Sequence, residues 1–262
     1  MRRAHHLSGP ELSRTLTAES ILVLPLGAIE HHGAHLPLAT DAILAERLAE
    51  RVVSAAAGDG HDVWLLPTLS YTKSDEHAWA PGTMTLSPAT LQAVLVDLGR
   101  SIARTPARTV LCYNGHGGNV APLGIALREL RRRFGLRTFA ETVQLASGDG
   151  VTAPDERGFG IHGGHEETSL LLHLAPELVS MPAAVRSVPD GPAGFSRIGL
   201  AGAPVQFGWL SDDFGTGGVL GDPTAASAEV GERIADRLVE GGRRTIAEIA
   251  RWPFPPRDGD DW

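Results

Sequence analysis

The chain has 262 residues, 42% of them hydrophobic and 21% charged, which is the composition of an ordinary globular protein. Its formal net charge of −8 argues against a nucleic-acid partner, because contacts with phosphates require clustered Lys and Arg. The one basic run, Arg131 to Arg133, ends a predicted helix, where it complements the negative end of the helix dipole. We therefore expect no binding to nucleic acid.

Cysteine content and hydropathy indicate the compartment. The sequence holds one cysteine, Cys112, which excludes an internal disulfide and a site built from several cysteines. Residues 1–10 begin with basic side chains but lack the apolar stretch of about 7–15 residues that a secretory signal requires. No run approaches the roughly 18 apolar residues of a membrane helix. We expect a cytoplasmic protein without a membrane partner.

Strand and helix patterns alternate along the chain. Apolar runs bounded by turn residues predict buried strands at 21–27, 63–69, 109–113 and 137–145. Helical patterns cover 41–57, 88–104, 120–134, 165–174 and 224–249. Thr40, Ser87 and Asn119 precede the first three helices as candidate N-caps. This order predicts a largely parallel sheet with helices on both faces.

The chain is thus predicted to form an α/β fold, a single three-layer αβα domain over residues 1–252. Residues 180–224 are rich in Gly and Pro and are expected to cover the sheet edge or a subunit contact. The tail at 253–262 starts with Pro253 and cannot be helical there.

Acidic and imidazole side chains follow each predicted strand. In open α/β sheets, ligands bind beyond the carboxyl ends of the strands, so these side chains are expected to meet at one end of the sheet. They are Glu30, His32 and Asp41 after the first strand, Ser74 and His77 after the second, His116 after the third, and His162 and Glu167 after the fourth.

Four of these residues form a candidate metal site. Zinc, manganese and iron(II) bind well to imidazole nitrogen and carboxylate oxygen. Glu30 and His32 are two residues apart, so an extended backbone places their side chains on one side. Asp41 has two oxygens with which to bridge two ions about 3.5–4 Å apart, and His116 would join from the third strand. We expect one or two divalent ions per subunit, with zinc favoured and manganese or iron as alternatives.

The glycine-rich loop at 114–119 is a candidate substrate contact. Gly117 and Gly118 permit positive φ and a close approach of the backbone to a ligand, and the helix that follows favours anions. The loop lacks the Lys-Ser/Thr ending of a P-loop, and no Gly-x-Ser-x-Gly serine elbow occurs in the chain. The pattern therefore does not favour nucleotide triphosphate hydrolysis or a serine hydrolase.

Taken together, five segments resemble the creatininase family, in order and over roughly residues 20 to 230. They are 24–38 with Thr40 and Asp41, 74–77, 114–119, 162–169 and 218–223. The resemblance implies hydrolysis of a non-peptide or unusual amide C–N bond by a metal-activated water. It also implies a three-layer αβα fold and assembly into homo-oligomers, often hexamers.

The resemblance also implies roles for particular residues. Glu30 would bind one metal ion and Asp41 would bridge two. His32 and His116 would bind the second ion. His162 matches the family's catalytic histidine, to which we assign proton transfer to the leaving nitrogen.

Further roles stay open at this point. Glu167 would act as an outer-sphere base or as an additional ligand. Ser74 and His77 belong to the family's Ser-x-Glu-His pattern and would position the substrate, whereas Glu76 in that pattern is either functional or structural.

The chain departs from creatininase itself in two places. Creatininase has a carboxylate two residues after the histidine that matches His116, and this chain has Gly118 there. The tryptophan that precedes the catalytic histidine of creatininase is absent from 157–161. We therefore expect a small-molecule amide other than creatinine, and a metal site that Glu167 or water completes.

Three alternatives compete with this reading. Two of them lie within the family. The first is a formamide deformylase that acts on a ring-opened purine or flavin intermediate, and the second is a peptidase that trims a mycofactocin-type precursor peptide of a redox cofactor. From a different class, the chain would be a metal-binding subunit without activity. The presence of Asp41, His116 and His162 together favours an enzyme.

Overall fold

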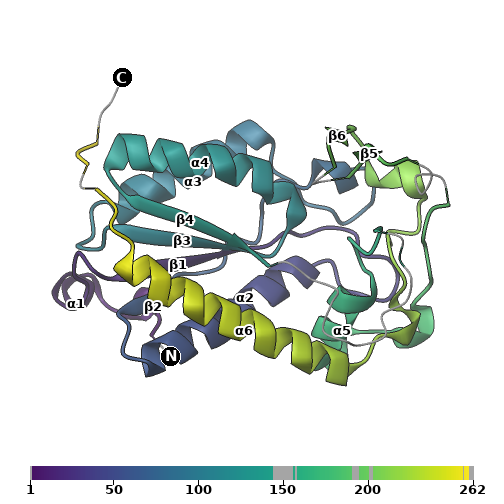
Figure 1. Cartoon of the computed structure of the whole chain (residues 1–262), viewed down its shortest axis with the longest axis horizontal. Helices are drawn as coiled ribbons and strands as arrows, with labels where there is room; N and C mark the ends of the chain where they lie inside the picture. Colours follow the sequence, from purple (N-terminus) through teal and green to yellow (C-terminus); the bar gives the residue numbers. More distant parts are fainter. Residues whose placement is uncertain are drawn as a thin grey trace.

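The computed structural model describes residues 2–143, 156, 158–190, 195–200, 203–255 and 257–259. Its centre is a four-stranded, fully parallel sheet in the order β2-β1-β3-β4 (Figure 1). The strands are β1 (Ile21–Leu26), β2 (Val63–Leu65), β3 (Thr109–Asn114) and β4 (Arg137–Thr142). A separate pair of short strands is formed by β5 (Ile198–Gly199) and β6 (Val205–Gln206).

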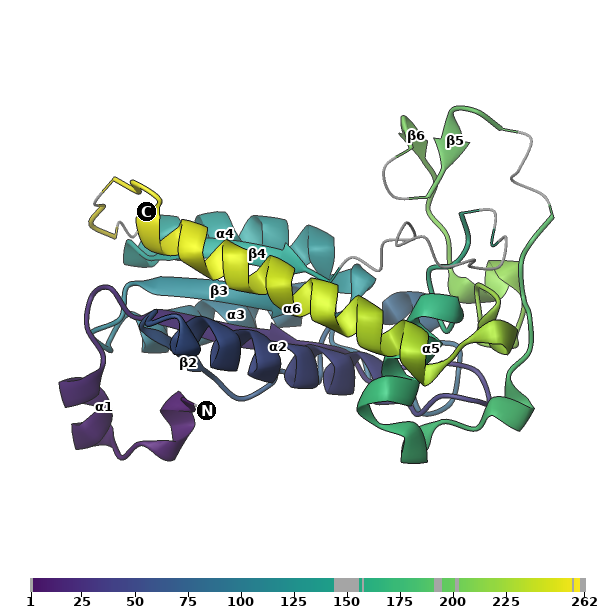
Figure 2. The same cartoon turned by 60° about the horizontal axis from the view of Figure 1, so that its bottom comes forward.

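Helices cover both faces of the sheet (Figures 1 and 2). One layer contains α2 (Thr40–Gly58), α5 (His165–Leu174) and α6 (Ala228–Arg251), and the other contains α3 (Pro88–Ile102) and α4 (Val120–Phe134). Because strand side chains alternate, Ile21 and Val23 pack against the first layer, while Leu22 and Leu24 pack against the second. The predicted three-layer αβα architecture is confirmed. A short helix, α1 (Gly9–Thr15), precedes the sheet.

The helix starts test the predicted N-caps. Ser87 caps α3, since its Oγ accepts the backbone N–H of Thr90 at 3.2 Å. Thr40 is wrong as a cap, because it is the first residue of α2 and its hydroxyl donates to the carbonyl of Pro37. Asn119 also makes no capping bond. Its amide instead donates to the carbonyl of Gly27.

β1 and α3 end one and two residues before the predicted positions, and β2 and α6 differ from the prediction for local chemical reasons. β2 ends at Leu65 because Pro67 has no N–H for the ladder, and the chain rejoins the sheet only as an isolated bridge at Leu69. α6 starts at Ala228, after a 3₁₀ turn at 223–225, and Ser227 caps it. α5 has the predicted bounds, whereas the end of the fourth predicted strand, 144–145, lies outside the described residues.

The segment after α6 packs back on the sheet layer. Residues 252–255 are non-helical, as predicted. The guanidinium of Arg131 lies 4.1 Å from the centre of the Phe254 ring and donates to the carbonyl of Pro255 at 2.6 Å. Phe254 also meets Phe139 of β4 edge to face. Among the described helices, none is long and apolar enough to cross a membrane.

The described residues of the region at 180–224, which exclude 191–194 and 201–202, lie beyond the carboxyl ends of the sheet strands (Figures 1 and 2). β5 and β6 lie at the end of the molecule toward which the sheet strands point (Figures 1 and 2). From the same region, Ser211 donates to the carbonyl of Glu76 at 3.0 Å and accepts from the indole N–H of Trp79 at 2.6 Å. This region therefore covers the loop that follows β2.

A glycine in α6 permits its close packing on α5. A Cβ added to Gly231 would lie 1.9 Å from the carbonyl oxygen of Ser169. We expect Gly231→Ala to lower the free energy of unfolding by about 1–3 kcal/mol, because the two helices must separate. Gly241→Ala in the same helix meets open space and should raise that free energy by up to about 1 kcal/mol. Urea denaturation of both variants measures the difference, and equal effects would contradict the packing argument.

Candidate metal centre

The site lies beyond the carboxyl ends of β1 and β3, the two central strands. Leu26 and Asn114, their last residues, are register partners. Glu30 follows β1 and His116 follows β3, so both side chains converge on the gap between these strands. Asp41 enters from the first turn of α2. β2, the next strand after β1 in the chain, lies on one side of β1, and β3 lies on the other side. Parallel sheets bind ligands in the crevice beyond the carboxyl ends of strands whose connections lead to opposite sides in this way.

Six buried side chains bring potential ligand atoms within 4.8 Å of one another, in three overlapping groups. The groups are Glu30, Asp41 and His116; His32, Asp41 and Glu167; and Glu30, His32 and His162. All four residues expected as metal ligands are therefore together, with His162 and Glu167 beside them. The grouping differs from the expected one, because His116 lies with Glu30 rather than with His32. Asp41 belongs to both of the first two groups.

Backbone carbonyls determine which nitrogen of each histidine faces the group. His32 Nδ1 lies 3.1 Å from the carbonyl oxygen of Glu30, and His116 Nε2 lies 2.9 Å from that of Lys73. Since a carbonyl can only accept, we assign the proton to these two nitrogens. When each ring loses its second proton, the lone pairs lie on His32 Nε2, which is 3.4 Å from Asp41 Oδ1, and on His116 Nδ1, which is 3.1 Å from Asp41 Oδ2. Such outer contacts are typical of metal-binding histidines.

Buried atoms without a partner provide a test of whether a cation fits. Within the described part of the chain, Glu30 Oε2, His32 Nε2 and Asp41 Oδ2 are buried and have no hydrogen-bond partner. Leaving charged groups buried and unpaired is costly. A divalent cation would satisfy all three atoms, and mixed imidazole and carboxylate donors suit zinc, manganese or iron(II). The residues therefore fit the expected metal.

Burial and neighbouring charges both shift the pKa values of the side chains in this cluster. Burial raises the pKa of Glu30 to about 8, and the positive charge of His116 only partly opposes this. Burial also acts to raise the pKa of Asp41, but His32 and His116 hold it well below its usual value. Burial acts to lower the pKa of His116, yet Glu30 and Asp41 raise it to about 10. Protons on Glu30 and on the imidazoles of His32 and His116 therefore limit the negative charge of the cluster at neutral pH, and a cation must displace them.

Two further histidines are kept neutral beside this cluster. The ring of His162 lies 4.1 Å from the rings of both His32 and His77. Burial and the positive charge of His32 hold the pKa of His162 well below its usual value, and the same causes lower the pKa of His77 to about 3. His162 Nε2 donates to the carbonyl of His31 at 2.7 Å, which leaves Nδ1 as an acceptor. That Nδ1 lies 3.5 Å from Glu30 Oε1.

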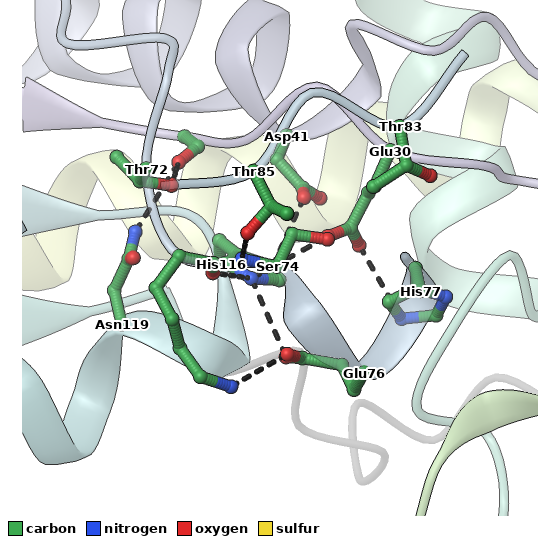
Figure 3. A network of polar contacts seen from close by, with 12 residues as sticks. Glu30, Asp41, Thr72, Ser74, Glu76, His77, Thr83, Thr85, His116 and Asn119 are labelled. Atoms are coloured by element: carbon green, nitrogen blue, oxygen red, sulfur yellow. Dashed lines mark hydrogen bonds and ion pairs between the residues drawn. The ribbon is translucent and has the colours of Figure 1, made fainter. Parts of the chain in front are cut away.

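The expected substrate residues have different environments. Ser74 is buried, its Oγ has no partner among the described residues, and His77 Nε2 lies 3.7 Å from Glu30 Oε1 (Figure 3). The positive-φ glycines of the described chain do not include Gly117 or Gly118, so this loop does not use the positive φ that glycine permits. Gly117 faces open space, whereas Gly118 is crowded by neighbouring side-chain atoms.

One pair of charged residues was not assigned from the sequence. Lys73 Nζ lies 2.6 Å from Glu76 Oε2 and 2.7 Å from Asp75 Oδ1. Glu76 Oε1 lies 3.6 Å from His116 Nε2. The sequence does contain a signal for this pair, since Lys73 is the only lysine of the chain and lies three residues before Glu76.

Comparison with known proteins agrees with the geometry. A family model described as "Creatininase: Creatinine amidohydrolase" matches residues 5–246. The mycofactocin precursor peptide peptidase of Mycolicibacterium smegmatis is 35% identical over 253 residues, which is 96% of this chain and 93% of the relative. The creatinine amidohydrolase of Pseudomonas putida is 32% identical over 265 residues, 93% of this chain and 94% of the relative.

Solved structures share the fold. "Creatininase Mn" superposes with a TM-score of 0.72 at 27% identity, covering 95% of this chain and 98% of that one. A mutant creatininase of "Zn-Zn type" superposes with a TM-score of 0.73 at 25% identity, covering 97% and 100%. The chain belongs to the creatininase family and is therefore a hydrolase of the amidohydrolase class.

Proposed function

We propose that this protein is a metal-dependent peptidase that hydrolyses an amide bond in a precursor peptide of the mycofactocin type. The observation that carries the metal dependence is the set of buried, unpartnered ligand atoms on Glu30, His32 and Asp41. The peptide substrate is supported by the 35% identity to a mycofactocin precursor peptide peptidase along nearly the whole chain. Creatinine is the second candidate, supported by the Pseudomonas putida relative and disfavoured by Gly118, where creatininase has a carboxylate.

The orientation of the two carboxylate oxygens of Asp41 favours a site with two metal ions. Its Oδ2 faces His116 and its Oδ1 faces His32, so each oxygen belongs to a different ligand group. We assign one ion to Glu30, Asp41 and His116, and the other to His32, Asp41 and Glu167. Zinc is proposed, with manganese or iron as alternatives. When bound, such ions supply Lewis acidity, which lowers the pKa of water and polarises an amide carbonyl.

Glu167 acts as a ligand rather than as a base in this proposal. Its Oε2 accepts the backbone N–H of Gly163 at 2.6 Å, which holds the carboxylate in place. The other oxygen, Oε1, lies 3.7 Å from His32 Nε2 and faces the second group. Glu167 would thus complete the group of His32 and Asp41, and it does not fill the gap that Gly118 leaves beside Glu30 and His116.

His162 is the proposed proton carrier. It is neutral, its Nε2–H is held by the His31 carbonyl, and its Nδ1 lone pair faces the site. A proton from the attacking water can pass to Nδ1 and then to the leaving nitrogen, and the lowered pKa favours its release. The unpartnered hydroxyl of Ser74 and the ring of His77 are proposed to position the substrate. Assembly into a homo-oligomer such as a hexamer and the cytoplasmic location stay predictions.

The proposed activity is tested with purified, metal-loaded protein. We expect hydrolysis of a mycofactocin-type precursor peptide, measured by mass spectrometry, and no turnover of creatinine. In Asp41→Asn, both metal groups lose a carboxylate oxygen, so bound metal and peptide hydrolysis should both be lost. Asp97→Asn, at a surface carboxylate paired with Arg100, serves as the matched control. Full metal content and activity in D41N would refute the metal assignment, and turnover of creatinine alone would refute the peptide.

Proton release accompanies metal binding in this account. Without metal, the carboxylates keep the pKa of His116 raised to about 10, so its imidazole is protonated at neutral pH and must lose that proton to bind. The affinity for zinc should therefore increase as the pH rises from 6 to 8. Calorimetric titrations in two buffers of different ionisation enthalpy should give different heats. A heat independent of the buffer, with an affinity independent of pH, would contradict the electrostatic account.

The role of His162 predicts a separation of metal binding from turnover. We expect His162→Asn to lower kcat by about 10²–10⁴-fold, because proton transfer to the leaving nitrogen is lost. Its metal content should stay at the wild-type value, since the carboxylates and the other imidazoles keep both proposed groups. Elemental analysis and steady-state kinetics on the same preparation measure both. If metal content and activity were lost together, His162 would instead be a metal ligand, in the group that it forms with Glu30 and His32.

A further inference from the structure

We infer that Glu76 is a positioning residue for His116, anchored by Lys73 and dependent on the absence of a side chain at Gly118. This inference rests on the proposed metal site, since it assigns a partner to one of its ligands. Glu76 belongs to none of the three ligand groups of the described chain. It lies instead on the other side of the His116 ring from Asp41 (Figure 3).

Lys73 and Glu76 lie beside the same ring nitrogen, Nε2, which is also 3.4 Å from Glu30 Oε2. The carbonyl of Lys73 accepts the Nε2–H of His116 at 2.9 Å, and Glu76 Oε1 lies 3.6 Å from that nitrogen. The side chain of Glu76 is only 11% exposed, and its second oxygen accepts from Lys73 Nζ at 2.6 Å. The nearly buried carboxylate of Glu76 is thus paired with Lys73 of the same loop through one oxygen, and its other oxygen faces the imidazole of His116.

Gly118 provides the space for this arrangement. A Cβ at position 118 would lie 2.2 Å from Glu76 Oε1, 2.4 Å from His116 Nε2 and 2.9 Å from the carbonyl oxygen of Lys73. Any side chain at this position would therefore displace the atoms that contact the ring. The glycine is explained by this close approach, since its backbone does not require positive φ.

The consequence is a fixed orientation and tautomer for His116. A negative charge beside Nε2 favours the proton on that nitrogen and leaves the lone pair on Nδ1, which faces Asp41 at 3.1 Å. Carboxylates in this position increase the basicity of a histidine ligand, and their loss typically weakens metal binding by about 10–100-fold. Lys73 keeps the carboxylate paired in a site where an isolated charge would be unfavourable.

The first test compares two carboxylates that share Lys73. Asp75 contacts the same Nζ, but its side chain is 53% exposed and, within the described residues, forms no ion pair with His116. We expect Glu76→Gln to weaken zinc binding to the metal-free protein by about 10–100-fold, measured by competition with a chromophoric chelator. Asp75→Asn should bind zinc as the wild type does. Glu76→Asp, which keeps the charge, should recover most of the affinity.

A second pair of variants tests the space at the glycine loop. Gly118→Ala places a methyl group where Glu76 and His116 approach and should lower zinc affinity as E76Q does. Gly117→Ala meets open space and should keep the wild-type zinc affinity. The melting temperature of each metal-free variant is measured alongside, because a purely structural ion pair would lower that temperature and leave zinc affinity unchanged.

The outcomes separate this inference from the proposed function. Wild-type zinc affinity in both E76Q and G118A, with binding lost in D41N, would overturn the positioning role and leave the metal centre intact. Equal weakening in E76Q and D75N would also overturn it, because the effect would then come from the charge on Lys73. Wild-type zinc binding in D41N would instead overturn the metal centre itself.

Discussion

The organisation of this protein depends on a cluster of carboxylates and imidazoles that is buried between the ends of β1 and β3. Charged groups without water or hydrogen-bond partners are strongly unfavourable unless an opposite charge lies among them. Glu30, His32 and Asp41 each keep a buried atom that has no hydrogen-bond partner within the described residues. The carbonyls of Glu30 and Lys73 contact the rings of His32 and His116, and the donor atoms of the cluster fit a divalent cation.

The fold and the composition of the site were largely predictable from the sequence. Buried parallel strands appear as continuous branched runs, such as 21–26, and these are distinct from the helical patterns between them. The carboxyl ends of parallel strands meet at one end of a sheet, which is why Glu30 and His116, far apart in sequence, could be expected together. The family resemblance added the roles, which stay predictions until tested.

The parts that could not be predicted depend on contacts across the fold. The grouping of His116 with Glu30, and the contact of the His116 ring with the carbonyl of Lys73, depend on positions that no sequence pattern shows. The reason for Gly118 likewise lies in the side chain of Glu76, 42 residues earlier in the chain. Proline effects were readable in principle, since Pro67 ends β2, but the apolar run around it concealed the break.

The most direct measurement is anomalous diffraction at the zinc absorption edge from crystals of the zinc-loaded protein. The account predicts two peaks that share Asp41, one bound by Glu30 and the Nδ1 atom of His116, the other by the Nε2 atom of His32 and by Glu167. A single peak bound through the Nε2 atom of His116, or zinc bound outside this cluster, would contradict it.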